Sequence, residues 1–430
     1  MQINIGLIGL GTVGSGTLDI LRRNSTLLTR RTGLELNVRR IATKHPHKKR
    51  SVPFDSAIVS SDVDALLADP SIHVVVELIG GVNPARDYVL RAIANGKSVV
   101  TANKELIAKH GGKIIDAAAE AGVDFLFEGS VAGGIPLLKP LRESLVGNHI
   151  NKLTGIVNGT TNFILTKMSR EHHEFATVLA EAQELGYAET DPTADVDGYD
   201  ATYKLAILAA IAFGTPVKID DIYREGIRGV SARDIENARG LGYVIKLVAL
   251  GRQHGDGQIE LRVHPTLLPV EHPLANVNDV YNAVLVQGDA AGEVMFFGRG
   301  AGGDPTGSAV VGDIVEAARN ISAGVSGRPR PHYHPELRMK DFAEVETRFC
   351  VRMQVVDRPG MLAKIATVFG DKGVSLQSIV QQKSDGETAE VFWMTHLTSQ
   401  RAMGRSLNVF HNLDAVHEIS SVLRVEGDVA

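Results

Sequence analysis

The first third of the chain alternates short apolar runs with amphipathic stretches. Between the runs, PARDYVLRAIANG and KELIAKHGGKIIDAAAEAG have the period of amphipathic helices, and SGTLDILRRNSTLL is expected to form one helix as well. The runs that predict strands are INIGLI, LELNVRRIA, HVVVELI, KSVVTA and VDFLFEG. This alternation predicts an α/β unit in which helices cover both faces of a mostly parallel sheet.

The pattern changes near residue 150. Strand-like segments separated by glycine and polar breaks predict a second, sheet-containing domain of α+β type: YVIKLVALGRQ, IELRVHPTLL, VYNAVLVQGD and EVMFFGRG. A helix of the first-domain type follows at residues 307–321, and the proline-rich GRPRPHYHP, residues 327–335, is typical of a stiff linker. After the linker the signals follow in the order βαββαβ, which predicts a small third domain.

Composition narrows the classes of function. A chain of 430 residues has room for two or three domains. A net charge of −5 gives no basic surface for nucleic acid, and no apolar run reaches the ~18 residues of a membrane span. The start, MQINIGLIGLG, lacks the basic segment and cleavage site of a secretory signal, so we expect a cytoplasmic protein. The single cysteine, Cys350, permits neither an intramolecular disulfide nor a thiolate metal cluster.

The turn after the first predicted strand, GLGTVG, has the spacing of a dinucleotide-binding loop. Gly9 permits the tight turn, Gly11 lets the backbone approach a pyrophosphate, and Gly14 allows the following helix to pack closely on the sheet. The N-terminus of that helix then directs free N–H groups toward the phosphates. An ordinary glycine turn is the alternative, but the strand, turn and helix together favour a dinucleotide.

The end of the second predicted strand bears on the choice of cofactor. An NAD-specific site usually has an acidic residue there to hold the ribose 2′-hydroxyl, whereas this segment runs NVRRIATKHPHKKR. Arg39 or Arg40, together with Lys44, would instead meet a 2′-phosphate, so we expect NADP(H) to be preferred and NAD(H) to be possible. A solvated basic loop is the alternative.

The segment GYDATYK places Asp200 and Lys204 four residues apart on a predicted helix, where their side chains share a face and can hydrogen-bond. Because the apolar run LAILAAIAF follows, this face should turn toward a core or cleft. Burial lowers the pKa of a lysine and a neighbouring carboxylate raises it, so the pair is suited to hold a proton near neutrality, as a general acid must. An exposed helical salt bridge is the alternative.

A second lysine, Lys104 in TANKEL, follows a predicted strand at the position where the carboxyl end of a parallel strand meets the ligand crevice. Two lysines over one substrate suit a carbonyl oxygen or a carboxylate. Glu189, Asp195 and Asp200 would then bind an ammonium group, so the expected substrate carries an amine and a reducible carbonyl. DVDG, residues 195–198, lacks the other acidic positions of a calcium loop, and calcium is not expected.

Taken together, these motifs resemble bacterial homoserine dehydrogenase along essentially the whole chain. AQELGYAETDPTADVDGYDATYK, residues 182–204, matches the family signature, and GLGTVG, TANKEL, EGSVAGGIP and NGTTNFIL occur in the family's order. The tail resembles an ACT domain, a βαββαβ module that binds amino acids. The resemblance implies a Rossmann-type nucleotide-binding domain at 1–150 completed by a helix at about 303–322, a substrate-binding and oligomerisation domain at 151–302, a linker at 323–345, and the ACT domain at 346–427.

The family reduces L-aspartate 4-semialdehyde with NAD(P)H to L-homoserine, on the way to threonine, methionine and isoleucine. The resemblance implies that Lys204 is the proton donor and that Asp200 is its partner and a substrate ligand. It also implies that Glu189 binds substrate and that Lys104 lies between cofactor and substrate. Further positions that it places near the cofactor are Thr12, Val13, Gly186 and Gly302.

The resemblance extends to two more ligands. Glu128, Val131, Gly133 and Ile135, in EGSVAGGIP, match the family's sodium site, in which one carboxylate and backbone carbonyls bind the ion; a glycine-rich hinge is the alternative. In DRPGML, Gly360 lies where a strand turns into a helix and leaves N–H groups free for an effector carboxylate, and we expect feedback inhibition by threonine. ACT modules usually pair, so we expect a homodimer or homotetramer.

Two other functions compete with this interpretation. A semialdehyde dehydrogenase that forms a thioester needs a nucleophilic cysteine in its catalytic domain, whereas Cys350 lies in the tail on a predicted buried strand. A non-catalytic amino-acid sensor would use the first domain and the tail as binding modules. A sensor has no need of the proton donor that Lys204 provides, so the sequence favours the enzyme.

Overall fold

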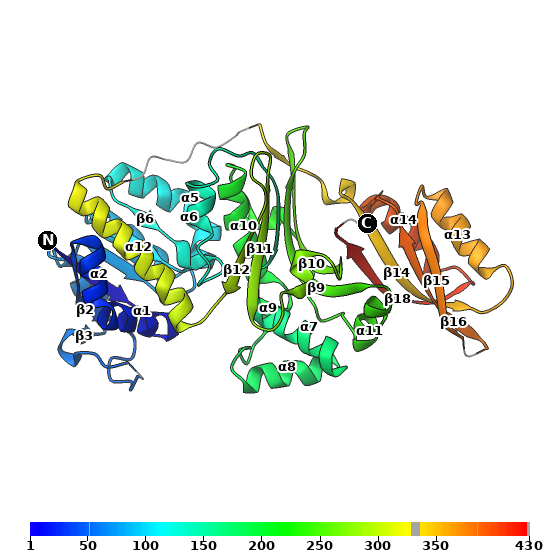
Figure 1. Ribbon diagram of the computed structural model, residues 1–430, viewed down its shortest axis with the longest axis horizontal. Coiled ribbons are helices and arrows are strands. Elements are labelled where there is room, and N and C mark those ends of the chain that lie inside the picture. Colours follow the sequence, from blue (N-terminus) through cyan, green and yellow to red (C-terminus); the bar gives the residue numbers. More distant parts are fainter. Residues whose placement is uncertain (51, 328–335, 385, 428–430) are drawn as a thin grey trace.

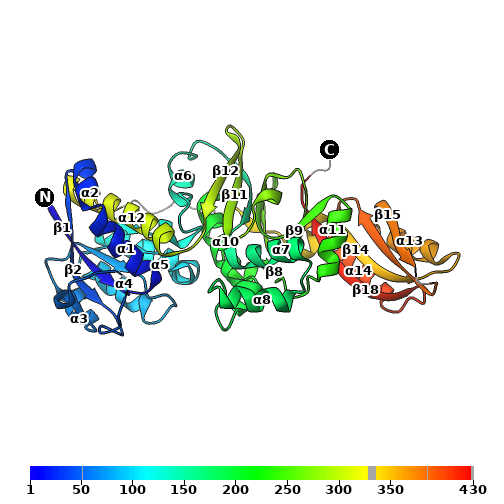
Figure 2. The same ribbon diagram turned by 60° about the horizontal axis from the view of Figure 1, so that its bottom comes forward.

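The computed structural model describes residues 1–50, 52–327, 336–384 and 386–427, which form three units in a row (Figure 1). The first and the C-terminal units lie at opposite ends, with a middle unit between them (Figure 2). Of the predicted linker at 327–335, all but the first residue lies outside the described residues. Within the described part, no helix is both long and apolar enough to cross a membrane.

The first unit is built on a six-stranded parallel sheet in the order β3-β2-β1-β4-β5-β6. The strand order changes direction beside β1, so the carboxyl ends of β1 and β4 meet at the ligand crevice of such a sheet. The strands are β1 (Gln2–Ile8), β2 (Glu35–Ala42), β3 (Val59–Ser60), β4 (Val74–Glu77), β5 (Ser98–Thr101) and β6 (Phe125–Leu126). The helices along the chain are α1 (Thr12–Arg23), α2 (Ser25–Thr32), α3 (Val63–Ala68), α4 (Ala85–Ala94) and α5 (Lys104–Ala121).

The stretch at 15–28 that was expected to form one helix lies on two, α1 and α2. The break is at Asn24, whose backbone has φ −104° and ψ 11° and so leaves the helical conformation. The prediction of a single helix was therefore wrong, because Asn24 ends one helix and begins the next.

Helix α12 (Gly303–Ala323) returns to the first unit from far along the chain and lies against α1 (Figure 1, yellow beside blue). Glycines permit this close approach. A Cβ atom on Gly16 would be 2.3 Å from the carbonyl oxygen of Gly303, and one on Gly307 would be 2.8 Å from the backbone nitrogen of Thr17. Larger residues at these two positions would force the helices apart.

The middle unit combines antiparallel strands with helices. Leu247, Leu261 and Val263, on one face of the sheet, join the core that contains α10. The strands are β7 (Ile150–Ile156), β9 (Tyr243–Gln253), β10 (Gln258–Pro269), β11 (Tyr281–Gly288) and β12 (Gly292–Arg299), with a short β8 (Tyr223–Arg224). The helices are α6 (Leu138–Arg142), α7 (Gly159–Glu171), α8 (Phe175–Glu184), α9 (Thr193–Val196), α10 (Tyr199–Ala212) and α11 (Ala232–Gly240).

The C-terminal unit has the predicted βαββαβ order. Trp393, Phe369 and Phe410 form the centre of its apolar core. Its elements are β14 (Glu346–Val356), α13 (Met361–Asp371), β15 (Leu376–Ser384), β16 (Thr388–Thr395), α14 (Gln400–Phe410) and β18 (Val416–Val425), with short strands β13 (Arg338–Met339) and β17 (Thr398–Ser399).

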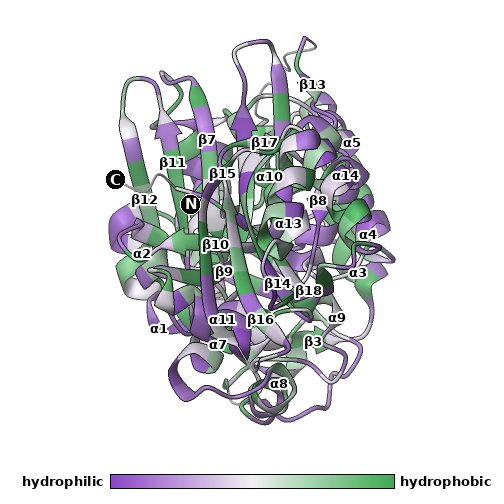
Figure 3. Ribbon diagram, turned by 90° about the vertical axis from the view of Figure 1, so that its right-hand side faces the viewer, coloured by the Kyte–Doolittle hydropathy of each residue, from purple (hydrophilic) through white to green (hydrophobic). Residues whose placement is uncertain are grey.

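The sheets of the middle and C-terminal units are joined, which the sequence did not predict. Strand β18 pairs in parallel with β10 at Thr266–Arg424 and Leu267–Val425, so one sheet runs β12-β11-β7-β9-β10-β18-β14-β16-β15. Viewed from the C-terminal end, β11 and β12 at one edge carry hydrophobic and hydrophilic bands (Figure 3). Any movement of the C-terminal unit against the middle unit must therefore bend or break backbone pairing.

Candidate active site

Lys104 is the first residue of α5 and follows the end of β5 after a short turn. Asn103 caps this helix, because its side-chain oxygen accepts a hydrogen bond from the backbone nitrogen of Leu106 at 3.1 Å. The Lys104 side chain is 43% exposed and extends to Asp200 on α10, which packs beside α5. Two units of the chain thus meet at one lysine–carboxylate ion pair.

Asp200 and Lys204 lie one turn apart on α10, as their spacing predicts. Lys204 Nζ donates to Asp200 Oδ2 at 2.6 Å and to the carbonyl oxygen of Val157, just after β7, at 2.7 Å. Both side chains are buried. The exposed helical salt bridge, which the sequence left open, is therefore excluded.

The two lysines bind different oxygens of the same carboxylate, with Lys104 on Oδ1 and Lys204 on Oδ2. Burial alone would raise the pKa of Asp200, but the charges of Lys204 and Lys104 hold that pKa well below its usual range. The charge of Asp200 raises the pKa of Lys104 against the effect of burial. Burial lowers the pKa of Lys204. The charge of Lys104 lowers it further, and the charge of Asp200 offsets only part of the decrease. Lys204 is thus the better proton donor of the two.

Asn158 joins the acidic groups, and sequence reasoning assigned it no role. Its side-chain nitrogen donates to Asp195 Oδ1 at 2.6 Å and to Asp200 Oδ2 at 2.8 Å, while its oxygen caps α7 through Thr161. Burial and the charge of Asp200 raise the pKa of Asp195. In the sequence, Asn158 is recognisable only as an asparagine at the start of a helix, in NGTTNFIL. That position indicates a helix cap, but it does not predict the hydrogen bonds to Asp195 and Asp200.

The remaining substrate and cofactor positions lie in different parts of the first two units. Glu189 is exposed, and its charge contributes to the raised pKa of Lys104, so it lies within the same electrostatic field. Gly186 follows α8 with open space around it, and Gly302 is the residue before α12. Gly303, next to it, lies close to Thr12 in the nucleotide turn.

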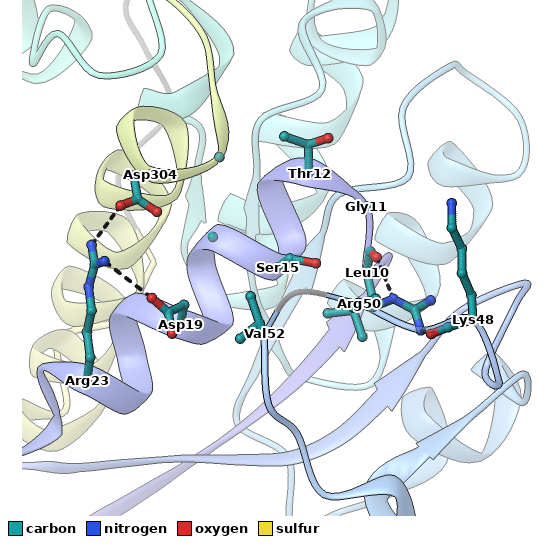
Figure 4. Close-up of a pocket in the computed structure, with 12 residues that line it drawn as sticks. Leu10, Gly11, Thr12, Ser15, Asp19, Arg23, Lys48, Arg50, Val52 and Asp304 are labelled. Atoms are coloured by element: carbon teal, nitrogen blue, oxygen red, sulfur yellow. Dashed lines mark hydrogen bonds and ion pairs between the residues drawn. The ribbon is translucent and has the colours of Figure 1, made fainter.

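The nucleotide turn has the geometry that its glycines predict. Gly9 has φ +104°, and a Cβ atom there would be 2.7 Å from the carbonyl oxygen of Leu78. A Cβ atom on Gly14 would be 2.2 Å from the carbonyl oxygen of Gly9, whereas Gly11 has open space before it. The turn borders a pocket of about 640 Å³ (Figure 4), lined by residues that include Gly11, Thr12, Ser15, Lys48, Arg50 and Gly303. Val13 follows in the first turn of α1.

The basic residues in the last part of β2 and in the loop after it divide into two groups. Arg40 forms an ion pair with Asp69 at 2.7 Å, away from the lining of the pocket. Arg50 and Lys48 line the pocket, and Arg50 Nε donates to the carbonyl oxygen of Leu10 at 2.9 Å (Figure 4). Sequence reasoning missed these two, although they belong to the same basic run, HPHKKR. The sequence does not predict how the loop after β2 folds, and that fold determines which of its basic side chains lie beside the nucleotide turn.

The proposed cation position has a suitable set of oxygens. Glu128 accepts hydrogen bonds from the backbone nitrogens of three residues at the start of α6, at 2.5, 2.8 and 2.8 Å. Among the described residues, no backbone N–H donates to the carbonyl oxygens of Val131, Gly133 or Ile135. Val131 and Ile135 are also buried. One carboxylate and carbonyls without backbone donors are the ligands that a hard cation prefers, so these residues fit sodium.

In the C-terminal unit, Gly360 is the residue before α13 and has φ +88°. The chain makes a turn here between β14 and the helix, with open space around Gly360. Cys350 is buried in this unit, and burial raises the pKa of its thiol to about 12. It is therefore unsuited to act as a nucleophile.

Comparisons with known proteins agree over the whole length. Family models described as homoserine dehydrogenase, its NAD-binding domain and the ACT domain match residues 136–315, 9–128 and 351–414. Homoserine dehydrogenase of Synechocystis is 46% identical, covering 99% of this chain and all of that protein. The crystal structure of a homoserine dehydrogenase from Thiobacillus denitrificans is 44% identical, with a TM-score of 0.92 over 99% of this chain and 98% of that one.

A hyperthermophilic archaeal homoserine dehydrogenase in complex with NADPH is 32% identical, with a TM-score of 0.62 over 74% of this chain and 98% of that one. These matches confirm the predicted fold class, with a Rossmann-type unit, a substrate unit and an ACT unit. The chain belongs to the homoserine dehydrogenase family, NAD(P)-dependent oxidoreductases that act on a CH–OH group.

Proposed function

We propose that the chain reduces L-aspartate 4-semialdehyde to L-homoserine with NADPH, in the biosynthesis of threonine, methionine and isoleucine, and that Lys204 donates the proton. The observation that carries this proposal is the carboxylate of Asp200, which binds Lys104 of the first unit and Lys204 of the middle unit. An aldehyde oxygen above this cluster meets one lysine that readily releases a proton and a second that remains charged.

The hydrogen bonds of Lys204 define how it delivers the proton. An ammonium group has three donors, and two of them are taken by Val157 and Asp200. The third is left for the aldehyde oxygen, and Lys204 becomes neutral as that oxygen becomes a hydroxyl. When bound, the nicotinamide cofactor supplies the hydride to the carbonyl carbon. Lys104 stabilises negative charge on the substrate, while Asp195 and Glu189 bind its ammonium group.

The first test is the oxidation of NADPH by purified protein with L-aspartate 4-semialdehyde, with homoserine identified by chromatography. The expected result is that the unaltered protein forms homoserine and that Lys204→Ala lowers the rate about a thousandfold. NADPH binding without turnover in the unaltered protein would contradict the proposal and would favour the amino-acid sensor.

The cofactor preference is proposed to be NADPH, with Arg50 and Lys48 meeting the 2′-phosphate. Arg40, which the sequence suggested, is partnered by Asp69. Lys48→Ala should raise KM for NADPH about tenfold, the value of one charge-assisted hydrogen bond, and leave KM for NADH unchanged. Arg40→Ala is the matched variant: a larger effect there would assign the phosphate to Arg40. Equal KM values for both cofactors in the unaltered protein would remove the preference itself.

The sodium site is proposed at Glu128, Val131, Gly133 and Ile135, with a structural role. Replacing sodium by choline at constant ionic strength should lower the thermal midpoint of the first two units. The variant Glu128→Gln should lower the midpoint and abolish its dependence on sodium. A midpoint that does not change with sodium in the unaltered protein would contradict the site.

Feedback control is proposed to act through the C-terminal unit, with threonine bound near Gly360. The N-terminus of α13 offers backbone N–H groups to a carboxylate. Threonine should inhibit the full chain and not a chain that ends at residue 345. Equal inhibition of both would place the effector elsewhere.

A homodimer or homotetramer in the cytoplasm is proposed as the working form. Strand β15 lies at one edge of the long sheet, and β12, with exposed Met295 and Phe297, lies at the other. Both edges offer unpaired backbone groups to another copy. Light scattering coupled to size exclusion would give the mass, and a monomer at micromolar concentration would contradict the proposal.

A further inference from the structure

Glu77 is a buried carboxylate that the mechanism above does not use. It is the last residue of β4, at the crevice end of the parallel sheet, and it is 0% exposed. The side chain accepts hydrogen bonds from the backbone nitrogen of Ile79 at 2.8 Å, the hydroxyl of Thr101 at 2.8 Å and the side-chain amide of Asn103 at 3.3 Å. Each of these donors belongs to a segment that borders the proposed active site.

The first set of bonds fixes the start of α5. Asn103 donates to Glu77 and to the carbonyl oxygen of Gly81 at 2.6 Å, while its own oxygen caps the helix. Its backbone nitrogen donates to the hydroxyl of Thr101, which in turn donates to Glu77. Asn103 is thus connected to the Glu77 carboxylate twice, directly through its side chain and through its backbone nitrogen by way of the Thr101 hydroxyl.

The second set fixes the turn after β4. The bond from Ile79 holds this turn against Glu77, and the carbonyl oxygen of Leu78 lies where a Cβ atom on Gly9 would be. The segment that Glu77 organises therefore abuts the nucleotide turn on one side. On the other side it reaches Asn103 through Gly81.

We propose that Glu77 is a positioning residue, whose carboxylate orients Lys104 and the turn beside the nucleotide loop as one assembly. The proposal rests on the role of Lys104 proposed above. Within the described residues no cation pairs with Glu77, and burial raises its pKa while its donors lower it. Both oxygens of a carboxylate accept hydrogen bonds, so Glu77 can accept from all of these donors at once. In Glu77→Gln an NH₂ group replaces one oxygen and would face at least one of the donors, with which it cannot form the same hydrogen bond.

The test combines Glu77→Gln with Lys104→Ala in the full chain. Because a small misplacement of a catalytic group is costly, Glu77→Gln should lower kcat by about 10- to 100-fold. If Glu77 acts through Lys104, the same substitution in the Lys104→Ala background should lower kcat by less than about threefold. A merely structural role would lower the active fraction equally in both backgrounds.

Asp124→Asn is the matched control. Asp124 is also a fully buried carboxylate of the first unit, and it accepts from the side chain of Asn320 at 3.0 Å and the backbone nitrogen of Gly327 at 3.1 Å. It precedes the amino end of β6, whereas Lys104 follows the carboxyl end of the neighbouring parallel strand β5. This variant should lower the thermal midpoint and leave kcat per folded molecule within about twofold.

Thr101→Val covers the case in which Glu77→Gln does not fold, because it removes only one donor to Glu77. It should lower kcat in the same direction, and less so when Lys104 is already alanine. Equal effects in both backgrounds, or an unchanged kcat in Glu77→Gln, would overturn the proposal. Full turnover by Lys104→Ala alone would instead defeat the assignment of Lys104.

Discussion

Two of the buried charge clusters of the protein contain different sets of cations. The catalytic cluster consists of Lys104, Lys204, Asn158 and Asp195 around the carboxylate of Asp200. The junction cluster consists of Lys152, Arg252 and Arg262 around the carboxylate of Glu426. In both, burial would raise the pKa of the central carboxylate, and the surrounding cations hold that pKa below its usual range.

The clusters differ in what their cations can release. Lysine gives up a proton when its surroundings lower its pKa, whereas arginine stays protonated in proteins. Lys104 also reaches solvent, while the Arg262 side chain is 1% exposed. The catalytic cluster is therefore suited to exchange a proton, whereas the two arginines of the junction cluster are suited to hold two units together.

The position of each cluster in the fold agrees with this difference. Glu426 follows β18, and its backbone nitrogen donates to the carbonyl oxygen of Leu267 on β10 at 3.0 Å. Arg424, nearby on β18, bonds Glu225 beside β8 at 2.8 Å. The junction charges thus accompany the parallel pairing of β10 with β18, and they specify which units meet.

Lys204→Ala should have the largest effect. Removal of a general acid costs about 10²–10⁴ in rate, so kcat should fall about a thousandfold while NADPH binding, followed by cofactor fluorescence, stays near normal. An equal loss of cofactor binding would show that Lys204 supports the nucleotide site or the fold instead.

Glu426→Gln should come next, and it should affect stability without affecting chemistry. Breaking a buried ion pair on one side leaves unpaired charge, which costs about 3 kcal/mol. Trp393, the single tryptophan, lies in the C-terminal core and reports its unfolding in urea. The fluorescence midpoint should fall while kcat without effector stays within about twofold.

Lys364→Ala is the control for that variant, because it breaks an exposed pair with Asp414 in the same unit. No measurable change of the midpoint is expected there. If both variants shift the midpoint equally, the junction cluster has no special role in docking.

Asp200→Asn should change the pH dependence. In the direction of reduction Lys204 must be protonated, so kcat falls as pH rises through its pKa. The charge of Asp200 raises that pKa against the effect of burial. Without it, the alkaline limb of the kcat profile should move to lower pH by about one unit. A limb that stays in place or moves to higher pH would exclude Lys204 as the titrating donor.

Asn158→Ala should have the smallest of these effects. It removes two hydrogen bonds to Asp195 and Asp200 but keeps all the charges, so kcat should fall about tenfold. KM for the aldehyde should rise as well, because Asp195 loses its orientation. A variant with unaltered kinetics would show that the two lysines alone position Asp200.

Much of the fold was predictable because its signals are local. The strand, glycine turn and helix at GLGTVG, and the alternating pattern behind it, specify a parallel sheet without any distant contact. Asp200 and Lys204 were likewise predictable, because a spacing of four on a helix determines that two side chains meet. The boundary at Asn24 was missed, since two successive helices share the pattern of one.

The sequence by itself determined the three units, the nucleotide turn and the lysine–aspartate pair, because helix and strand periods and turn chemistry act over a few residues. Only the tertiary structure decided that Lys104 joins Asp200, that Asn158 bridges two acids, that Glu77 lies under Asn103 and that β18 joins β10. Those pairings depend on which strand ends and helix starts meet in space. A buried polar group takes whichever partner the packing brings to it.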